Sequence, residues 1–265
     1  MTPSKGPGFS RKTLDALEID DERSFRHVGL YGELREILRK DGYVFRVLPP
    51  ALEGRWDRAL FLNLTYWGTE GGDVLVDERI EADVVTHAAW HHLAARAFPA
   101  APGERPSADA MFLGEAIASA FDVYLVGRLI GHAPDSSFLA TQVPAMADVA
   151  SDAGLSEDAF EALLAGVVAD PDRAFEDLRQ LLFDATTALF ACHSPEEALD
   201  ALAPLDEHRF APLLHRYELS NWVLHVRTYG GGSIAADPRV RAVDRALREA
   251  PVALDWLTRA WVDGR

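Results

Sequence analysis

Hydrophobic and polar residues follow two different periods along this chain, and the change between them predicts the architecture. In the first third, short runs of β-prone residues bounded by turn-forming residues predict strands over 43–48, 60–67 and 73–76. Apolar residues at helical spacing predict helices over 13–40, 82–98, 108–130, 156–168, 171–191, 195–202, 207–227 and 237–262. The sequence therefore predicts an α+β, mostly α-helical fold, in which a small N-terminal sheet precedes a helical bundle.

The same pattern suggests how the chain is organised. Residues 1–12 (MTPSKGPGFSRK) resemble a flexible tail, and residues 13–265 form a single predicted globular domain. Within that domain, an α/β portion over 13–80 leads into a helical portion over 81–265. A length of 265 residues with 48% hydrophobic content is enough to bury a sizeable core.

Charge and composition exclude several classes of function. The formal net charge of -16 repels nucleic-acid phosphates and anionic membrane surfaces, so neither is an expected partner. We find no apolar run of the ~18 residues that a membrane span requires, and no secretory signal. A single cysteine, Cys192, rules out an intrachain disulfide. A cytoplasmic location is therefore expected, with an oligomeric state that the sequence leaves open.

Candidate chemistry is concentrated on the helix predicted over 82–98. His87 and His91 are four residues apart, so they share one helix face and could reach one metal ion. Asp83 lies one turn earlier and could orient His87 by accepting its second ring N–H, or could act as a ligand itself. His92 points about 100° away from His91 and is a poorer ligand candidate. A pair of core histidines without a metal would have the same spacing.

A carboxylate on the next predicted helix favours the metal interpretation. Glu115 is the only acid in the middle of an apolar stretch, and a lone buried carboxylate needs a partner such as a cation. Two histidines and one glutamate with an open fourth position form a typical catalytic zinc set. Asp122 lies two turns beyond Glu115 on the same face and could orient a ligating histidine.

Two segments resemble a known family. VVTHAAWHHL followed by GEAIASAFD is similar to the gluzincin metallopeptidases, the thermolysin-like group, with their H-E-x-x-H helix and later glutamate helix. The resemblance covers roughly residues 60–130 and implies a zincin-like scaffold. It assigns the zinc ligands to His87, His91 and Glu115. It also implies that Asn63, Leu64 and Thr65 lie on the edge strand that holds a peptide substrate.

The chain departs from the family pattern where the chemistry occurs. Ala88 stands where the family has its catalytic glutamate, and losing a positioned acid/base group typically costs ~10²–10⁴-fold in rate. Ser119 stands where the family has an aspartate that supports the ligands. His92 and His225 are candidates for a replacement catalytic group, and His225 could alternatively stabilise an oxyanion. Glu78 and Glu81 are further candidates for the base, and the sequence does not choose among them.

Two functional hypotheses follow. In the first, the chain binds zinc in a metallopeptidase-like site whose peptidase activity is lost or altered. If the site is active, the chain is a zinc-dependent hydrolase of a peptide or small-molecule substrate. In the second, the chain is a metal-free helical scaffold or protein-interaction module, and its histidines are structural. A second metal site at His208 and His215 is a weaker interpretation, because exposed or capping histidines explain those positions equally well.

Overall fold

The distribution of contacts divides the chain into two units, Met1–Ala89 and Trp90–Arg265, where the sequence predicts a single domain. The computed structural model describes residues 9–49, 74–101, 103–229 and 236–264. The predicted strand over 60–67, with Asn63, Leu64 and Thr65, lies outside these residues. The division falls inside one continuous helix, α4 (Ala82–Ala97).

Among the described residues of the first unit, five short strands pair. β1 (Ser10–Thr13) runs antiparallel to β3 (Val44–Val47), and β3 runs parallel to β4 (Val74–Leu75). A second sheet pairs β2 (Glu18–Asp20) in parallel with β5 (Arg79–Glu81). The strands predicted over 43–48 and 73–76 are thus confirmed. β1 begins at Ser10, inside the segment predicted to be a tail.

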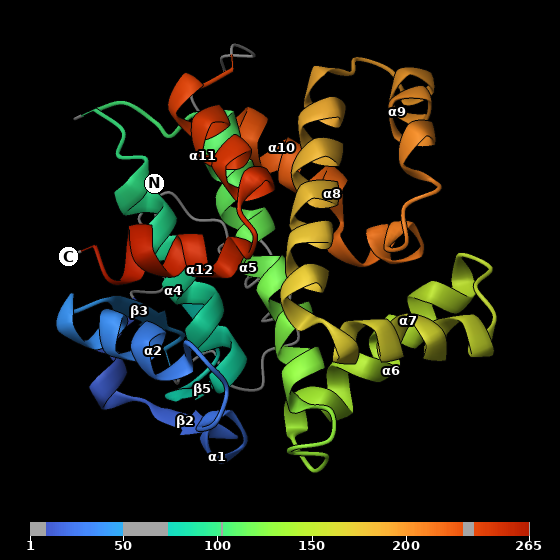
Figure 1. Cartoon of the computed structure of the whole chain (residues 1–265). Coiled ribbons are helices and arrows are strands. Elements are labelled where there is room, and N and C mark those ends of the chain that lie inside the picture. Colours follow the sequence, from blue (N-terminus) through green and yellow to red (C-terminus); the bar gives the residue numbers. More distant parts are fainter. Residues whose placement is uncertain (1–8, 50–73, 102, 230–235, 265) are drawn as a thin grey trace, which may run out of the picture. The chain divides into compact units, whose positions relative to one another are not determined.

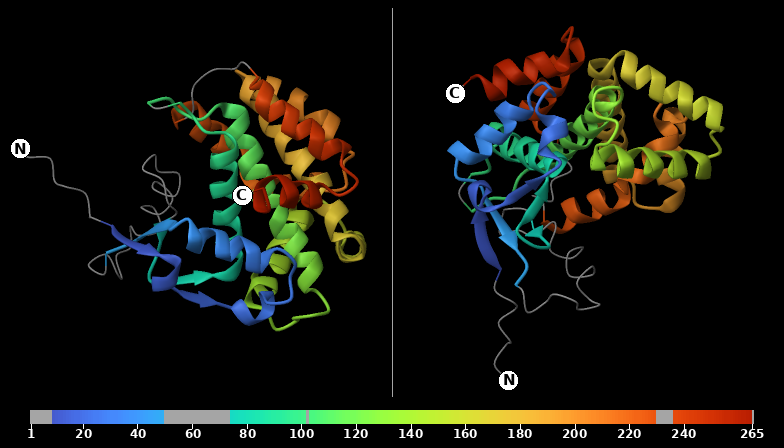
Figure 2. Two further views of the ribbon diagram at one scale, coloured as in Figure 1. Left: turned by 60° about the vertical axis from the view of Figure 1, so that its left-hand side comes forward. Right: turned by 90° about the horizontal axis from the view of Figure 1, so that it is seen from below.

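Helices accompany these strands (Figure 2). The helix predicted over 13–40 is confirmed only toward its end, as α2 (Tyr31–Lys40). Before α2 the chain forms the short 3-10 helix η1 (Leu14–Ala16), strand β2 and the one-turn helix α1 (Glu22–Phe25). The continuous-helix prediction was wrong because the alternating Glu18-Ile19-Asp20 segment gains backbone hydrogen bonds from β5.

The second unit is helical. Its core pair is α5 (Ala108–Leu129) and α8 (Pro171–Ala191), which run side by side (Figure 1). The remaining elements are α6 (Ser137–Asp152), α7 (Glu157–Ala169), α9 (Pro195–Leu202), η3 (Ala203–Leu205), η4 (Ala211–Tyr217), α10 (Leu219–Tyr229), α11 (Pro238–Glu249), α12 (Ala253–Leu257) and η5 (Thr258–Val262). The chain is therefore α+β and mostly helical, as predicted.

Helix α5 is buried along most of its length, as expected of a largely apolar helix at the centre of its unit. Ser107 caps its first turn, where the Oγ atom accepts a hydrogen bond from the backbone N–H of Ala110 at 3.2 Å. Among the described residues, α5 is the one helix long and apolar enough to cross a membrane, but 89% of that window is buried inside the protein. This burial is typical of a core helix in a soluble protein.

A buried ion network joins α8 to α11. Arg179 is fully buried and donates from Nε and Nη2 to the two carboxylate oxygens of Glu176, each at 2.7 Å. Its Nη1 atom donates to Oδ1 of Asp244 on α11 at 2.8 Å. Asp244 also accepts from Nε of Arg248 at 3.0 Å. These bonds supply the partners that a buried guanidinium requires.

Candidate metal centre

The three ligands expected from the sequence lie on two helices. His87 and His91 are on α4, one turn apart, and Glu115 is on α5. Each histidine is half-buried, while Glu115 is only 8% exposed. The Nε2 atoms of both histidines and Oε2 of Glu115 are shielded from solvent. Three ligating atoms of the types preferred by zinc are therefore gathered in a largely dry environment.

The distances fit a shared cation. One ligand atom from each of His87, His91 and Glu115 lies within 4.8 Å of the other two, and the described residues contain no other such group of three. Nε2 of His91 is 3.1 Å from Oε2 of Glu115. Ligand atoms on one tetrahedral zinc ion, with bonds of about 2.0–2.2 Å, are about 3.3–3.6 Å apart. Small side-chain movements would thus complete a three-ligand set.

Close helix packing brings Glu115 next to His91. Gly114 precedes Glu115, and a Cβ atom added there would lie 3.1 Å from the Cβ of Ala94, one turn beyond His91. Two small residues therefore let the backbones of α4 and α5 approach. The buried rings of Trp90 and Phe121 meet edge to face, with centroids 5.5 Å apart, and fix the same contact.

Ser119 contacts the ligand set directly. Its buried Oγ atom donates a hydrogen bond to Oε1 of Glu115 at 3.4 Å, one helical turn away. The structure thus places Ser119 where it can orient the carboxylate. Asp83 is in the first turn of α4, where a negative charge also favours the helix N-terminus. Asp122 lies within electrostatic range of Tyr217: burial raises the pKa of Tyr217, Arg216 opposes that effect, and the negative charge of Asp122 adds to it.

The two alternative histidines have different surroundings. His225 on α10 lies within electrostatic range of Glu115: burial lowers the pKa of His225, and the negative charge of Glu115 opposes that effect. His92 is half-buried on α4 and is not part of the three-residue ligand group.

Ala88, at the position of the family's general base, is 2% exposed. Glu78 forms an ion pair with Lys12 at 2.7 Å, and Glu81 lies on β5 opposite Asp20 of β2.

The other candidate sites have structural explanations. His208 accepts a hydrogen bond at Nδ1 from the backbone N–H of Phe210 at 3.2 Å, which fixes the imidazole locally. His215 is exposed on η4. Neither belongs to a three-ligand group among the described residues.

Comparison with protein-family models, with curated proteins and with solved structures finds no match for this chain. A functional assignment therefore depends on the residues themselves. The strongest feature is the His-His-Glu geometry, and its donor set can hold one divalent transition metal with at least one position left open.

Proposed function

We propose that this chain binds one zinc ion through His87, His91 and Glu115, in a gluzincin-like site whose peptidase activity is lost or altered. The observation that supports the proposal is the gathering of the three ligand atoms within 4.8 Å of one another. Two imidazoles and one carboxylate match the preferences of zinc among the common divalent metals. The hydrogen bond from Ser119 would hold the carboxylate of Glu115 in a ligating orientation.

The side chains define what such a site could do. A bound zinc ion would supply Lewis acidity for hydrolysis of a peptide or small-molecule substrate. Ala88 carries no proton acceptor, so efficient peptidase chemistry would need another group. His225, which lies within electrostatic range of Glu115, is the best-placed replacement candidate. We propose a zinc-dependent hydrolase if the site is active, and a metal-binding pseudoenzyme if it is not.

Metal content and stability test this proposal together. Full-length protein purified without chelator should contain one zinc per chain by elemental analysis. Removing the metal should lower the Tm, because ligand binding to the folded state adds to its stability. Protein that carries no stoichiometric metal and gains no stability from added zinc would overturn the proposal.

Single substitutions locate the site. His87→Ala, His91→Ala and Glu115→Ala should each weaken zinc binding by more than about 100-fold, since losing a residue that only orients a ligand costs about 10–100-fold. His92→Ala is the matched control, because it removes a neighbouring half-buried imidazole from the same helix. If His92→Ala empties the site and His91→Ala leaves it intact, the ligand assignment is incorrect.

The second candidate function is a metal-free helical scaffold or interaction module. The observation that favours it is that His87 and His91 are half-buried, because histidines in a protein core commonly have structural roles without a metal. In that case the three ligand variants should alter stability equally with and without zinc. We propose a cytoplasmic location for either function, on the basis of the single cysteine.

A further inference from the structure

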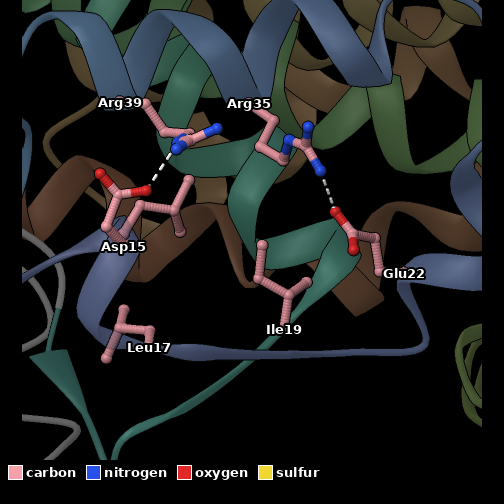
Figure 3. A pocket seen from close by; sticks show the side chains of 7 residues that line it. Asp15, Leu17, Ile19, Glu22, Arg35 and Arg39 are labelled. Carbon is pink, nitrogen blue, oxygen red and sulfur yellow. Dashed lines mark hydrogen bonds and ion pairs between the residues drawn. The ribbon is translucent and has the colours of Figure 1, made fainter.

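A cavity of about 260 Å³ lies beneath α2 in the first unit, separate from the residues of the candidate metal centre (Figure 3). Helix α2 contributes Arg35 and Arg39 to its lining, and the preceding segment contributes Asp15 and Glu22. Arg35 and Arg39 are one helical turn apart, so both guanidinium groups reach the same side of α2. Each guanidinium is paired with one of the two carboxylates, so the cavity is flanked by two ion pairs, Arg39 with Asp15 and Arg35 with Glu22.

Each ion pair in this lining leaves hydrogen-bonding capacity unused. Arg39 donates from Nε to Oδ1 of Asp15 at 2.6 Å, and Arg35 donates from Nη1 to Oε1 of Glu22. A guanidinium has five N–H donors and a carboxylate has about four acceptor sites. Within the described part of the chain, Nη2 of each arginine and the second oxygen of each carboxylate form no hydrogen bond.

The remaining lining is aliphatic. Leu14 is buried, while Leu17 and Ile19 are half-buried and contribute branched side chains to the cavity. Figure 3 shows Leu17 and Ile19 below the two ion pairs. The lining therefore has no net charge, because two guanidinium groups balance two carboxylates around an apolar floor.

We propose that this cavity binds a zwitterionic α-amino acid with a branched aliphatic side chain. The carboxylate of the ligand would face Arg35 and Arg39, and its ammonium group would face Asp15 and Glu22. Its side chain would cover Leu17 and Ile19. The volume agrees with a small ligand, since sites for drug-sized molecules are about 300–1,000 Å³.

A ligand series on the wild-type, full-length protein tests each part of this recognition. Calorimetric titration with L-leucine, with EDTA present to prevent zinc complexes, should give saturable binding. Leucinamide lacks the carboxylate, 4-methylpentanoate lacks the ammonium group and glycine lacks the side chain. Each should bind at least about 10-fold more weakly, because a lost charge-assisted contact exceeds about 1.4 kcal/mol. No heat from L-leucine up to about 10 mM would overturn the proposal.

Substitutions then assign the binding to this cavity. Arg39→Gln and Asp15→Asn should each weaken L-leucine binding by at least about 10-fold while circular dichroism shows an unchanged helix content. Lys40→Gln is the matched control, because Lys40 is exposed on α2 and does not line the cavity. Equal binding by all three variants would exclude this site. If Arg39→Gln does not fold, the ligand series alone decides, since leucinamide binding as tightly as L-leucine would contradict the role of the arginines.

Discussion

Gly114 and Ala94 meet where α5 crosses α4, and a Cβ atom added to Gly114 would lie 3.1 Å from the Cβ of Ala94. Real Cβ atoms rarely approach so closely. The absence of a side chain at position 114 therefore sets the distance between the helix that carries Glu115 and the helix that carries His91.

Gly114→Val should separate the two helices and weaken the metal site. We expect zinc affinity to fall at least about 10-fold and the free energy of unfolding to fall by about 1–3 kcal/mol, as for other overpacked cores. Gly32→Val on α2 is the control, because no atom lies within 4 Å of the added Cβ there. Zinc titration and urea unfolding measure both effects. Unchanged zinc affinity in Gly114→Val would show that the helix spacing does not control the site.

Ser119→Ala should weaken zinc binding without abolishing it. The hydrogen bond from Ser119 to Glu115 is long, at 3.4 Å, so we expect a loss near the lower end of the usual range, about 10-fold. Ser156→Ala provides a contrast, since it removes the N-cap of α7 and should cost about 1 kcal/mol of stability. Ser156→Ala should bind zinc as tightly as the wild type does. Competition with a zinc indicator measures both affinities.

Ala88→Glu tests whether position 88 is the vacated base position. Wild-type protein should cleave casein and generic peptides little or not at all, and the variant should gain weak, zinc-dependent hydrolysis. Ala88→Gln is nearly the same shape without a basic oxygen and should stay inactive. Because Ala88 is only 2% exposed, the glutamate is tolerated only if its carboxylate reaches the open side of the metal. Unfolding of both variants, or inactivity of Ala88→Glu with zinc bound, would contradict the family comparison.

Arg179→Met should be strongly destabilising. It leaves the carboxylates of Glu176 and Asp244 without their buried cation, and breaking such a pair costs about 3–5 kcal/mol. Arg173→Met on the same helix removes the ion pair from the exposed Arg173 to Asp177, which keeps Arg209 as a partner, and should cost about 1 kcal/mol or less. Urea denaturation of both variants measures the difference. Similar losses for the two substitutions would show that burial does not govern the strength of this network.

The helical part of the fold and the placement of His87 and His91 on one helix face were predictable because both depend on local spacing. A four-residue interval places His87 and His91 on one face wherever the helix lies, and an isolated acid in an apolar helix indicates a buried carboxylate. Glu115 was grouped with the two histidines because a lone buried carboxylate needs a partner, and the family resemblance implied the same set. In the structure, Oε2 of Glu115 lies 3.1 Å from Nε2 of His91. The contact between Gly114 and Ala94, which brings the helices together, has no local signal in the sequence.

Other elements depend on residues that are distant in sequence. β2 is stabilised by its pairing with β5, and Asp20 and Arg79, which form an ion pair between these two strands, are 59 residues apart. The apolar residues at helical spacing within the helix predicted over 13–40 were therefore misleading. α6 was not among the predicted helices, and Pro144 in its interior removes one backbone donor. The helix predicted over 207–227 is divided at Glu218, which has a left-handed backbone with φ 47°. The pairs Asp15–Arg39 and Glu22–Arg35, which line the cavity, are likewise visible only after folding.

The Arg179–Asp244 bond also affects the order in which the second unit can form during synthesis. The two residues are 65 positions apart, so at about 5–20 residues per second the guanidinium emerges about 3–13 s before its α11 partner. During that interval α8 carries a cation whose burial is only partly compensated by Glu176. The nascent helix should therefore remain accessible to chaperones until the final helices leave the ribosome, and polypeptides released before residue 244 should be prone to degradation.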